Sequence, residues 1–395
     1  MSEAPWPEVT VVGIGADGWD GLSGAARAAF RAAEVVMGGA RQLGLLPDLP
    51  GERVPWPSPM LPALPGLFEA HRGRRIAVAA SGDPMFYGVG SVLVGLLGSV
   101  RVLPHPSSVS LACARLGWPV EDTEVVSAVG RPLAALNAVL APGRRVLVLS
   151  AGAGTPAQVA ALLEERGYGR SELTVLERLG APDERVGPLR DGVDALNIVA
   201  VRCRGEGVSL APGLPDEAYD HDGQLTKREV RAITLARLGP VPGELLWDVG
   251  AGAGSIAVEW MRTHRSCRAV AIERDPERAA RVGTNAASLG VPGLRLVIGP
   301  APAALAGLDA PDAVFVGGGV TVPGMVDTCW EALRPGGRLV VNAVTLESEQ
   351  VVAEARGRLG GELTRIAISR AAPVGGFTGW RPMMPVTQWT AVRER

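Results

Sequence analysis

The chain has 395 residues, of which 47% are hydrophobic and 20% are charged. This is the composition of a globular protein with room for two or three domains, and it excludes a disordered or fibrous chain. The formal net charge is -2 and acids and bases are mixed throughout, which gives no electrostatic basis for binding nucleic acid or an anionic membrane.

Cysteine spacing and the N-terminus bear on the compartment. The cysteines form no CxxC or Cys/His cluster, so we expect neither a metal site nor a disulfide framework, and a reducing cytoplasm fits best. No basic segment followed by an apolar core opens the chain, so no secretory signal is expected. The two long uncharged runs, 84–100 and 146–163, are interrupted by glycine, proline or polar residues and are too short for membrane spans.

The first half alternates short β-rich runs with helical patterns, which is typical of an α/β domain. We predict helices over 23–33, 85–97 and 107–116, one starting at Pro132, and one over 155–166. The predicted strands are "EVTVVGIG", "RRIAVAAS", "VRVLP", "TEVVSAV", "RRVLVLS", "ELTVLER" and "ALNIVAVR". We assign residues 1–204 to a first domain.

Residues 203–224 lack a sustained apolar period and are rich in glycine, proline and acids. We therefore predict a linker, placed at 205–222.

The alternation restarts in a second domain, residues 223–395. We predict helices from Thr226 and from Gly254, and over 276–288, 322–333 and 346–359. The predicted strands are "ELLWDV", "RAVAIE", "LRLVIG", "AVFVGG", "RLVVNAV", "ELTRIAIS" and "PVTQWTAV". This order predicts a doubly wound, Rossmann-like sheet.

A glycine turn joins a strand to a helix in "LLWDVGAGAGSIAVEW" and predicts a cofactor site, because missing side chains let a ligand approach the backbone. The spacing is GxGxG rather than the GxGxxG of dinucleotide sites, and Asp248 would repel a pyrophosphate. S-adenosylmethionine carries a sulfonium and an ammonium group and no phosphate, so it suits an acid there. Glu273 lies 23 residues after Gly250, close to the offset at which an acid binds ribose hydroxyls. NAD remains the alternative ligand.

The second half resembles class I S-adenosylmethionine-dependent methyltransferases, in particular the precorrin methyltransferases that decarboxylate a ring acetate. The motifs that carry this resemblance are "GQLTKREVRAITLARLGP", "DVGAGAGSIAVEW", "AIERDPERAARVGTNAASLG", "DAVFVGGG" and "LRPGGRLVVNAVTLE". Pro300 departs from the family pattern, in which an acid often lies near the adenine. The resemblance implies that the cofactor contacts Thr226, Gly250, Ala251, Gly252, Ala253, Gly254, Glu273 and Ala301.

The first half resembles the tetrapyrrole methylase family, a different fold class of S-adenosylmethionine enzymes with two α/β subdomains. The motifs are "VVGIGADGWDGLS", "AASGDPMFYGVG", "HPSSVSLACARLG" and "SAVGRPLAAL", in that order. Ala16 stands where the family usually has proline. The resemblance implies that a second cofactor site is lined by Ala16, Ser81, Gly82, Asp83, Phe86, Ser107, Ser108 and Val129.

The order of the two domains is similar to that of a family of fusion enzymes in cobalamin (vitamin B12) biosynthesis. This resemblance implies two S-adenosyl-L-methionine-dependent methylations of a precorrin, at carbon 5 by the N-terminal domain and at carbon 15 by the C-terminal domain, which also removes an acetate as carbon dioxide. It also implies one S-adenosyl-L-homocysteine product per domain and a homo-oligomer, with no nucleic-acid or membrane partner. An NAD-dependent dehydrogenase and a nucleic-acid methyltransferase are the alternatives.

The sequence identifies no catalytic residue. A sulfonium methyl group is already activated, so we expect positioning and exclusion of water rather than a Ser/His/Asp arrangement. For His105, beside the proposed N-terminal site, a loop or packing role is favoured over a catalytic one. Asp83 and Glu273 are better candidates for ligand binding than for general bases, and Asp248 is expected to orient the turn.

Several cations are candidates for pairing with substrate carboxylates, although a solvated surface role is favoured for each: Lys227, the only lysine, and Arg131, Arg228 and Arg381. The stretch "FTGWRPMMPVTQW", residues 377–389, gathers aromatic residues and methionines. Core packing and an edge-strand turn are the favoured interpretation, and a mobile wall against a flat macrocycle is the alternative.

Overall fold

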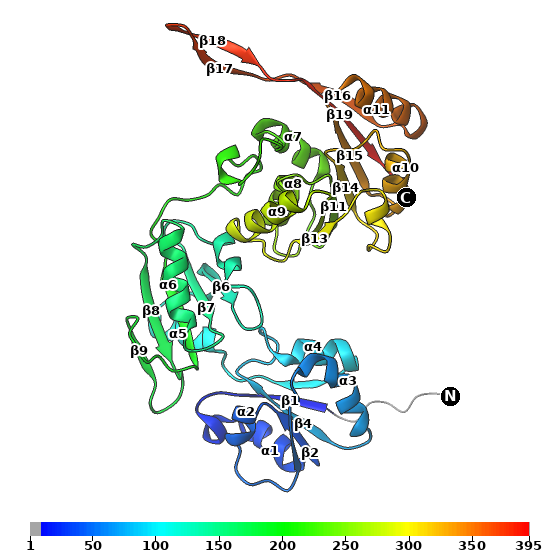
Figure 1. The fold of residues 1–395 in the computed structure, drawn as a ribbon. Helices are drawn as coiled ribbons and strands as arrows, with labels where there is room; N and C mark the ends of the chain where they lie inside the picture. Colours follow the sequence, from blue (N-terminus) through cyan, green and yellow to red (C-terminus); the bar gives the residue numbers. More distant parts are fainter. Residues whose placement is uncertain (1–8, 395) are drawn as a thin grey trace, which may run out of the picture. The chain divides into compact units, whose positions relative to one another are not determined.

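The computed structural model describes residues 9–394, which form two compact units (Figure 1). Unit 1 comprises residues up to 133 and residues 141–206; unit 2 comprises residues 134–140 and the chain from 207 onward. Within residues 9–394, no helix is both long enough and apolar enough to span a membrane. Both units are α/β, as the sequence predicts.

Unit 1 begins with a parallel sheet in the spatial order β3-β2-β4-β1-β5. Alternate residues of its strands enter two different cores: Val9 and Val11 pack with α3 and α4, while Val12 and Ile14 pack with α1 and α2. Burial on both faces explains the continuous apolar runs. The elements are β1 (Val9–Ile14), α1 (Gly24–Ala32), β2 (Val35–Gly38), α2 (Ala40–Gly44), β3 (Glu52–Pro55), α3 (Met60–Ala70), β4 (Ile76–Ser81), α4 (Val89–Leu97) and β5 (Arg101–Leu103).

The second sheet of unit 1 is mixed, in the order β6-β7-β10-β8-β9. Strands β6 and β7 are parallel, and the other pairs are antiparallel. The elements are α5 (Ser108–Leu116), β6 (Thr123–Ser127), β7 (Arg145–Leu149), α6 (Thr155–Glu165), β8 (Glu172–Glu177), β9 (Arg185–Gly187) and β10 (Asn197–Arg202). The two sheets match the two α/β subdomains expected for the first half.

Unit 2 contains a seven-stranded sheet in the order β13-β12-β11-β14-β15-β19-β16, in which β19 runs opposite to the other six strands. This confirms the doubly wound, Rossmann-like prediction. The elements are α7 (Arg228–Leu238), β11 (Leu245–Val249), α8 (Ser255–Thr263), β12 (Arg268–Glu273), α9 (Pro276–Ser288), β13 (Arg295–Ile298), β14 (Ala313–Val316), α10 (Met325–Ala332), β15 (Arg338–Ala343), α11 (Leu346–Leu359), β16 (Glu362–Ile366) and β19 (Val386–Val392).

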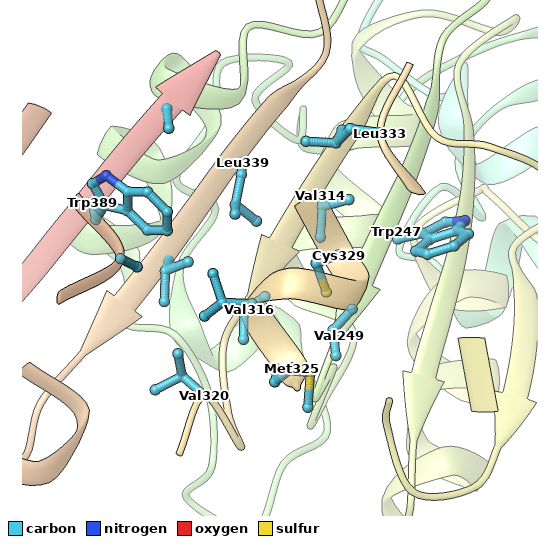
Figure 2. Packing of buried hydrophobic residues seen from close by; sticks show 14 of the residues in the cluster. Trp247, Val249, Val314, Val316, Val320, Met325, Cys329, Leu333, Leu339 and Trp389 are labelled. Carbon is cyan, nitrogen blue, oxygen red and sulfur yellow. The ribbon is translucent and has the colours of Figure 1, made fainter. Parts of the chain in front are cut away.

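Each face of the unit 2 sheet has its own core. Trp247, Val249 and Val314 pack with Met325 and Cys329 of α10, as Figure 2 shows. On the opposite face, Leu246 packs with residues of α7, α8 and α9. The alternation along β11 therefore fixes which helices cover which face.

Short 3-10 helices also occur, and one of them corrects a predicted helix. The pattern starting at Pro132 forms a 3-10 helix rather than an α-helix, in a segment where "GRPLAALNAVLAPG" has proline near both ends. The 3-10 helices are η1 (Gly18–Gly21), η2 (Val120–Asp122), η3 (Leu133–Ala138), η4 (Asp216–Ala218) and η5 (Ala303–Leu305).

The helix predicted over 85–97 begins only at Val89, with Gly88 as its N-cap. Asp83 therefore does not cap it; its Oδ1 accepts a hydrogen bond from the Met85 N–H at 2.9 Å and closes a tight turn instead.

Core packing, one part of the favoured interpretation of residues 377–389, is wrong for most of the stretch. Phe377 and Trp380 lie in a hairpin formed by β17 (Ser369–Val374) and β18 (Phe377–Pro382), and they are 85% and 76% exposed. Figure 1 shows this hairpin projecting beyond β16 and β19. Only the last strand supplies core residues, including the fully buried Trp389.

A buried charge network fastens residues 213–226 to the rest of unit 2. The Arg231 side chain is fully buried and donates Nε–H to Glu259 at 2.6 Å and Nη1–H to the Thr226 carbonyl at 2.6 Å. Glu259 also accepts hydrogen bonds from the Gly213 N–H at 2.6 Å and the Tyr219 hydroxyl at 2.8 Å. Every charge in this network is paired. The network therefore holds much of the predicted linker segment in place against α7 and α8.

We expect Glu259→Ala to lower the free energy of unfolding of unit 2 by about 3–5 kcal/mol, because it leaves the Arg231 guanidinium buried without a counter-charge. Urea denaturation followed by tryptophan fluorescence measures this. Glu362→Ala is the matched control: it breaks an exposed ion pair with Arg237 at 2.9 Å, worth at most about 1 kcal/mol. Equal effects of the two substitutions would contradict the role of burial.

Candidate active sites

A cavity of about 360 Å³ lies in unit 1, lined by residues from both of its sheets. One wall is formed where β1, β4 and β6 end and where α5 begins, and the other by residues of β7, β8 and β10. Its volume is in the range of small-molecule sites. All eight residues that the sequence singled out in this half line it: Ala16, Ser81, Gly82, Asp83, Phe86, Ser107, Ser108 and Val129.

Close backbone contact shapes the wall between the first two motifs. The Gly82 N–H donates to the Ile14 carbonyl at 3.0 Å. A Cβ added to Gly13 would lie 2.0 Å from the Gly82 oxygen, so only glycine fits at this crossing. This packing brings residues 15–16 and 81–83 to the same wall of the cavity.

Ser107 is the N-cap of α5: its Oγ accepts a hydrogen bond from the Ser110 N–H at 3.0 Å. The cap leaves the first turn of α5, with Ser108, at the cavity wall. The N-terminus of α5 carries a partial positive charge, which would attract a negatively charged group of a ligand there.

The sequence reasoning missed other residues that line the cavity, among them Arg41, Gln42, Trp56, Tyr87 and Asn197. Arg41 and Gln42 follow β2, a four-residue strand that was not predicted. The available signal was "VVMGGARQ", an apolar run that ends in glycines, which is the same strand-to-turn pattern as the two recognised motifs.

His105 does not line this cavity. Its Nε2 lies 3.2 Å from Asp17 Oδ2, and both residues line a separate cavity of about 420 Å³. A Cβ on Gly15 would come within 2.6 Å of the His105 ring. His105 therefore packs against the loop after β1, through Asp17 and Gly15, which agrees with the favoured loop or packing role.

In unit 2, the glycine turn follows β11 at the point where the strand order of the sheet reverses. From β11 the chain continues to β12 on one side, and from the adjacent β14 it continues to β15 on the other. Such switch points form the ligand crevices of open α/β sheets. A Cβ on Gly250 would lie 3.0–3.1 Å from the Gly318 backbone, so the loops after β11 and β14 are in close contact.

Two buried carboxylates flank this turn. Glu273 is 5% exposed and accepts hydrogen bonds from the Gly252 N–H at 2.8 Å and the Asp275 N–H at 3.0 Å. Asp248 is 1% exposed; its Oδ2 accepts from the Ala257 N–H at 3.0 Å, and its Oδ1 has no hydrogen-bond partner. The Glu273 carboxylate would repel a pyrophosphate and attract a cationic ligand, and Asp248 would add to both effects when it is ionised.

The remaining residues predicted for this site lie at the same edge of the sheet. The Gln224 carbonyl, two residues before Thr226, would lie 3.0 Å from a Cβ on Gly252. Ala301 follows β13, whose Ile298 pairs with Glu273. Thr226, residues 250–254, Glu273 and Ala301 thus come together around the carboxyl ends of β11, β12 and β13.

The four candidate partners for substrate carboxylates lie in different places. The Arg131 guanidinium is 4.9 Å from the centre of the Tyr87 ring, and Tyr87 lines the unit 1 cavity. Lys227 is the N-cap residue of α7, Arg228 begins that helix, and Arg381 lies on the exposed hairpin. Of the four, only Arg131 is connected to a described cavity. Within residues 9–394, no cluster of His, Cys, Asp or Glu is arranged to hold a metal ion.

Comparisons with known proteins match a different family to each half of the chain. Residues 8–191 match the tetrapyrrole (corrin/porphyrin) methylases and residues 217–393 match a precorrin methyltransferase domain. A precorrin-6Y C(5,15)-methyltransferase [decarboxylating] from Sinorhizobium sp is 49% identical over 98% of this chain and 96% of its own length. The chain belongs to the precorrin-6Y C(5,15)-methyltransferase family.

Membership of this family makes the chain a methyltransferase and confirms that interpretation over a dehydrogenase. Two shorter relatives each cover under half of the chain. A probable cobalt-precorrin-6B C(15)-methyltransferase (decarboxylating) from Pyrobaculum calidifontis is 37% identical, over 46% of this chain and 95% of its own length. A cobalt-precorrin-7 C(5)-methyltransferase from Salmonella typhimurium is 34% identical, over 45% and 88%.

The electrostatics of Asp248 predict a pH dependence of stability. The pKa of this carboxyl is raised to about 7, mainly by burial; the hydrogen bond from Ala257 opposes the rise and the Glu273 charge adds to it. The folded chain therefore keeps a proton that the unfolded chain loses near pH 4, so the contribution of Asp248 to stability falls as the pH rises toward 7.

We expect the free energy of unfolding of the unliganded wild type, relative to Asp248→Asn, to fall by about 3 kcal/mol between pH 5 and pH 8. The asparagine cannot titrate, so other groups cancel in the difference. Urea denaturation of both proteins across this range measures it. A difference that stays constant with pH would show that the Asp248 carboxyl has an ordinary pKa.

Proposed function

We propose that the chain methylates a precorrin at carbons 5 and 15 and removes a ring acetate as carbon dioxide, as a step of cobalamin biosynthesis. Unit 1 methylates carbon 5, and unit 2 methylates carbon 15 and decarboxylates. The observation that carries the proposal is the 49% identity to a C(5,15)-methyltransferase along nearly the whole chain. The two half-length relatives, named for carbon 15 with decarboxylation and for carbon 5, support the division.

Each unit is proposed to bind one S-adenosyl-L-methionine, which supplies a methyl group already activated on a sulfonium. In unit 1 the cofactor would lie in the 360 Å³ cavity, against the turns at Ala16 and Gly82 and the first turn of α5. In unit 2 it would lie over the glycine turn. There, the unpartnered oxygen of Asp248 and the Glu273 carboxylate fit a cationic ligand.

The side chains of the two sites are suited to hold and orient ligands rather than to exchange protons. In unit 1 the cavity wall combines backbone turns with apolar residues such as Leu176 and Ile198, which exclude water from the reacting carbon. In unit 2 the Arg231 network fixes the carbonyl of Thr226, so that the segment beside the turn is already positioned before ligands bind. Buried, unpaired thiols at all four cysteines support the proposed cytoplasmic location.

The division of labour is tested in the full chain by disabling one site at a time. We expect Asp83→Ala to abolish methylation at carbon 5 while carbon 15 methylation and carbon dioxide release continue. Glu273→Gln should do the reverse, because it weakens the hydrogen bond that shapes the unit 2 turn. Carbon-13-labelled methyl donor, followed by NMR of the product, locates each methyl group.

Loss of all three events in either variant, with the fold intact by circular dichroism, would contradict the division. Binding titrations with S-adenosyl-L-homocysteine complete the test, since two sites are expected in the wild type and one in each variant.

We further propose that the chain forms homo-oligomers through the β17–β18 hairpin. A two-stranded hairpin is marginally stable alone, and its open edges invite further pairing. Phe377 and Trp380 are highly exposed on it, and aromatic residues dominate protein interfaces. The base of the hairpin is anchored, because Arg370 pairs with Glu229 at 2.6 Å, so the hairpin is presented in a fixed direction.

We expect the double variant Phe377→Ser, Trp380→Ser to be a monomer by light scattering after size-exclusion chromatography, where the wild type is an oligomer. Leu346→Ser is the matched control: this residue is 81% exposed at the start of α11, outside the hairpin, and its loss should leave the assembly unchanged. A monomeric wild type, or an oligomeric double variant, would refute the role of the hairpin.

A further inference from the structure

Arg41 is a cation without a counter-charge at the wall of the unit 1 cavity. It lies in α2, and its Nη2–H donates to Ser81 Oγ at 3.0 Å. In the part of the chain that the structure describes, no carboxylate pairs with it. Arg178 differs in this respect, because it pairs with Asp183 at 2.7 Å.

The backbone next to Arg41 is held by its surroundings, and the exposed Arg41 side chain is oriented by its hydrogen bond to Ser81. Arg53, on β3, donates hydrogen bonds to the carbonyls of Leu43, Leu46 and Pro47 and thereby holds the end of α2. With α2 held and Ser81 accepting one N–H, the rest of the guanidinium is presented in a set direction. A preorganised guanidinium loses less conformational entropy when it binds a planar anion.

A second cavity, of about 340 Å³, adjoins the first at Arg41. The two cavities share Ala16, Arg41 and Leu196, and the second is otherwise lined by Leu45, Arg178, Asp194 and Ala195. The side cavity could therefore accept a short chain extending from a ligand in the main cavity, with Arg41 at the junction.

The electrostatics at Arg41 favour an anion, because Asp194, the acid that lines the side cavity, lies 3.8 Å from Arg178 and pairs with it rather than with Arg41. Partial burial lowers the pKa of Arg41, and the positive charge of Arg178 lowers it further; no acid contributes an opposing rise. A carboxylate bound here would pair with Arg41 and so offset both the cost of its partial burial and its repulsion from Arg178.

We propose that Arg41 binds a carboxylate of the ligand in the unit 1 cavity as a bidentate ion pair, and that it thereby determines specificity for carboxylate-bearing ligands. This inference rests on the proposed function. That function offers two sources of the same chemistry: an acetate or propionate of the precorrin, and the amino-acid carboxylate of the cofactor.

The test uses the full chain and two variants at this position, Arg41→Gln and Arg41→Lys. Arg101→Gln is the control, because Arg101 is an exposed arginine on β5 that lines neither cavity. Four constants are measured. They are the KM for precorrin in carbon 5 methylation and the Kd values of S-adenosyl-L-homocysteine, of its decarboxylated analogue and of uroporphyrin, a stable macrocycle with acetate and propionate side chains.

If the substrate supplies the carboxylate, Arg41→Gln raises the precorrin KM and the uroporphyrin Kd by about 10- to 100-fold and leaves S-adenosyl-L-homocysteine binding unchanged. If the cofactor supplies it, the variant weakens S-adenosyl-L-homocysteine binding at one site by a similar factor and leaves the decarboxylated analogue unaffected. In either case Arg41→Lys lies between wild type and Arg41→Gln, because it keeps the charge and loses the planar fork.

The inference is overturned if all of these constants stay within twofold of the wild type, or if the decarboxylated analogue is weakened as much as the parent compound. A wild type that binds these probes through Arg41 but transfers no methyl group to carbon 5 would refute the proposed function and leave the ion pair standing. Failure of the two proposals can thus be told apart.

Discussion

The close packing of backbone at the carboxyl ends of parallel strands is the constraint on which both sites depend. In unit 1 the oxygen of Gly82 occupies the space where a Cβ of Gly13 would lie, at 2.0 Å. In unit 2 the backbone of Gly318 lies 3.0–3.1 Å from where a Cβ of Gly250 would be. Any larger side chain would separate the loops and widen the turns. Two unrelated sheet topologies therefore use the same device, a glycine that lets two backbone segments approach closely at the end of a strand.

The charges around these turns differ between the units. The unit 2 turn is flanked by the buried carboxylates of Asp248 and Glu273 and has no cation among its described hydrogen-bond partners. The unit 1 cavity has Arg41 and the start of α5 at its wall. A sulfonium cofactor that also carries an ammonium and a carboxylate can satisfy either arrangement, but it would present different ends to the buried charges. If each unit binds one such cofactor, as proposed, the two units need not hold it in the same orientation.

The sequence predicted much of this fold because the decisive signals are local. Strands buried on both faces, such as residues 245–249, are continuous apolar runs, and Asp275 with Pro276 starts α9 as expected; its side chain accepts from the Glu277 N–H at 2.9 Å. The turn at Gly82 is likewise indicated by a local motif, "GDP". These features depend on a few neighbouring residues, so they can be read without knowing the tertiary structure.

What the sequence could not supply are features created by distant contacts. The missed β2 is only four residues long and is stabilised by pairing with β3 and β4, so its own pattern is too short to distinguish it. Arg41 reaches Ser81, forty residues away, only because that pairing places α2 beside the end of β4. The exposed hairpin misled the interpretation for a related reason. Hydrophobic aromatics predict a core only when the chain itself covers them, and Phe377 and Trp380 lie on strands that pair with nothing but each other within the described chain. Composition alone cannot separate a residue buried by its own fold from one available to a second molecule.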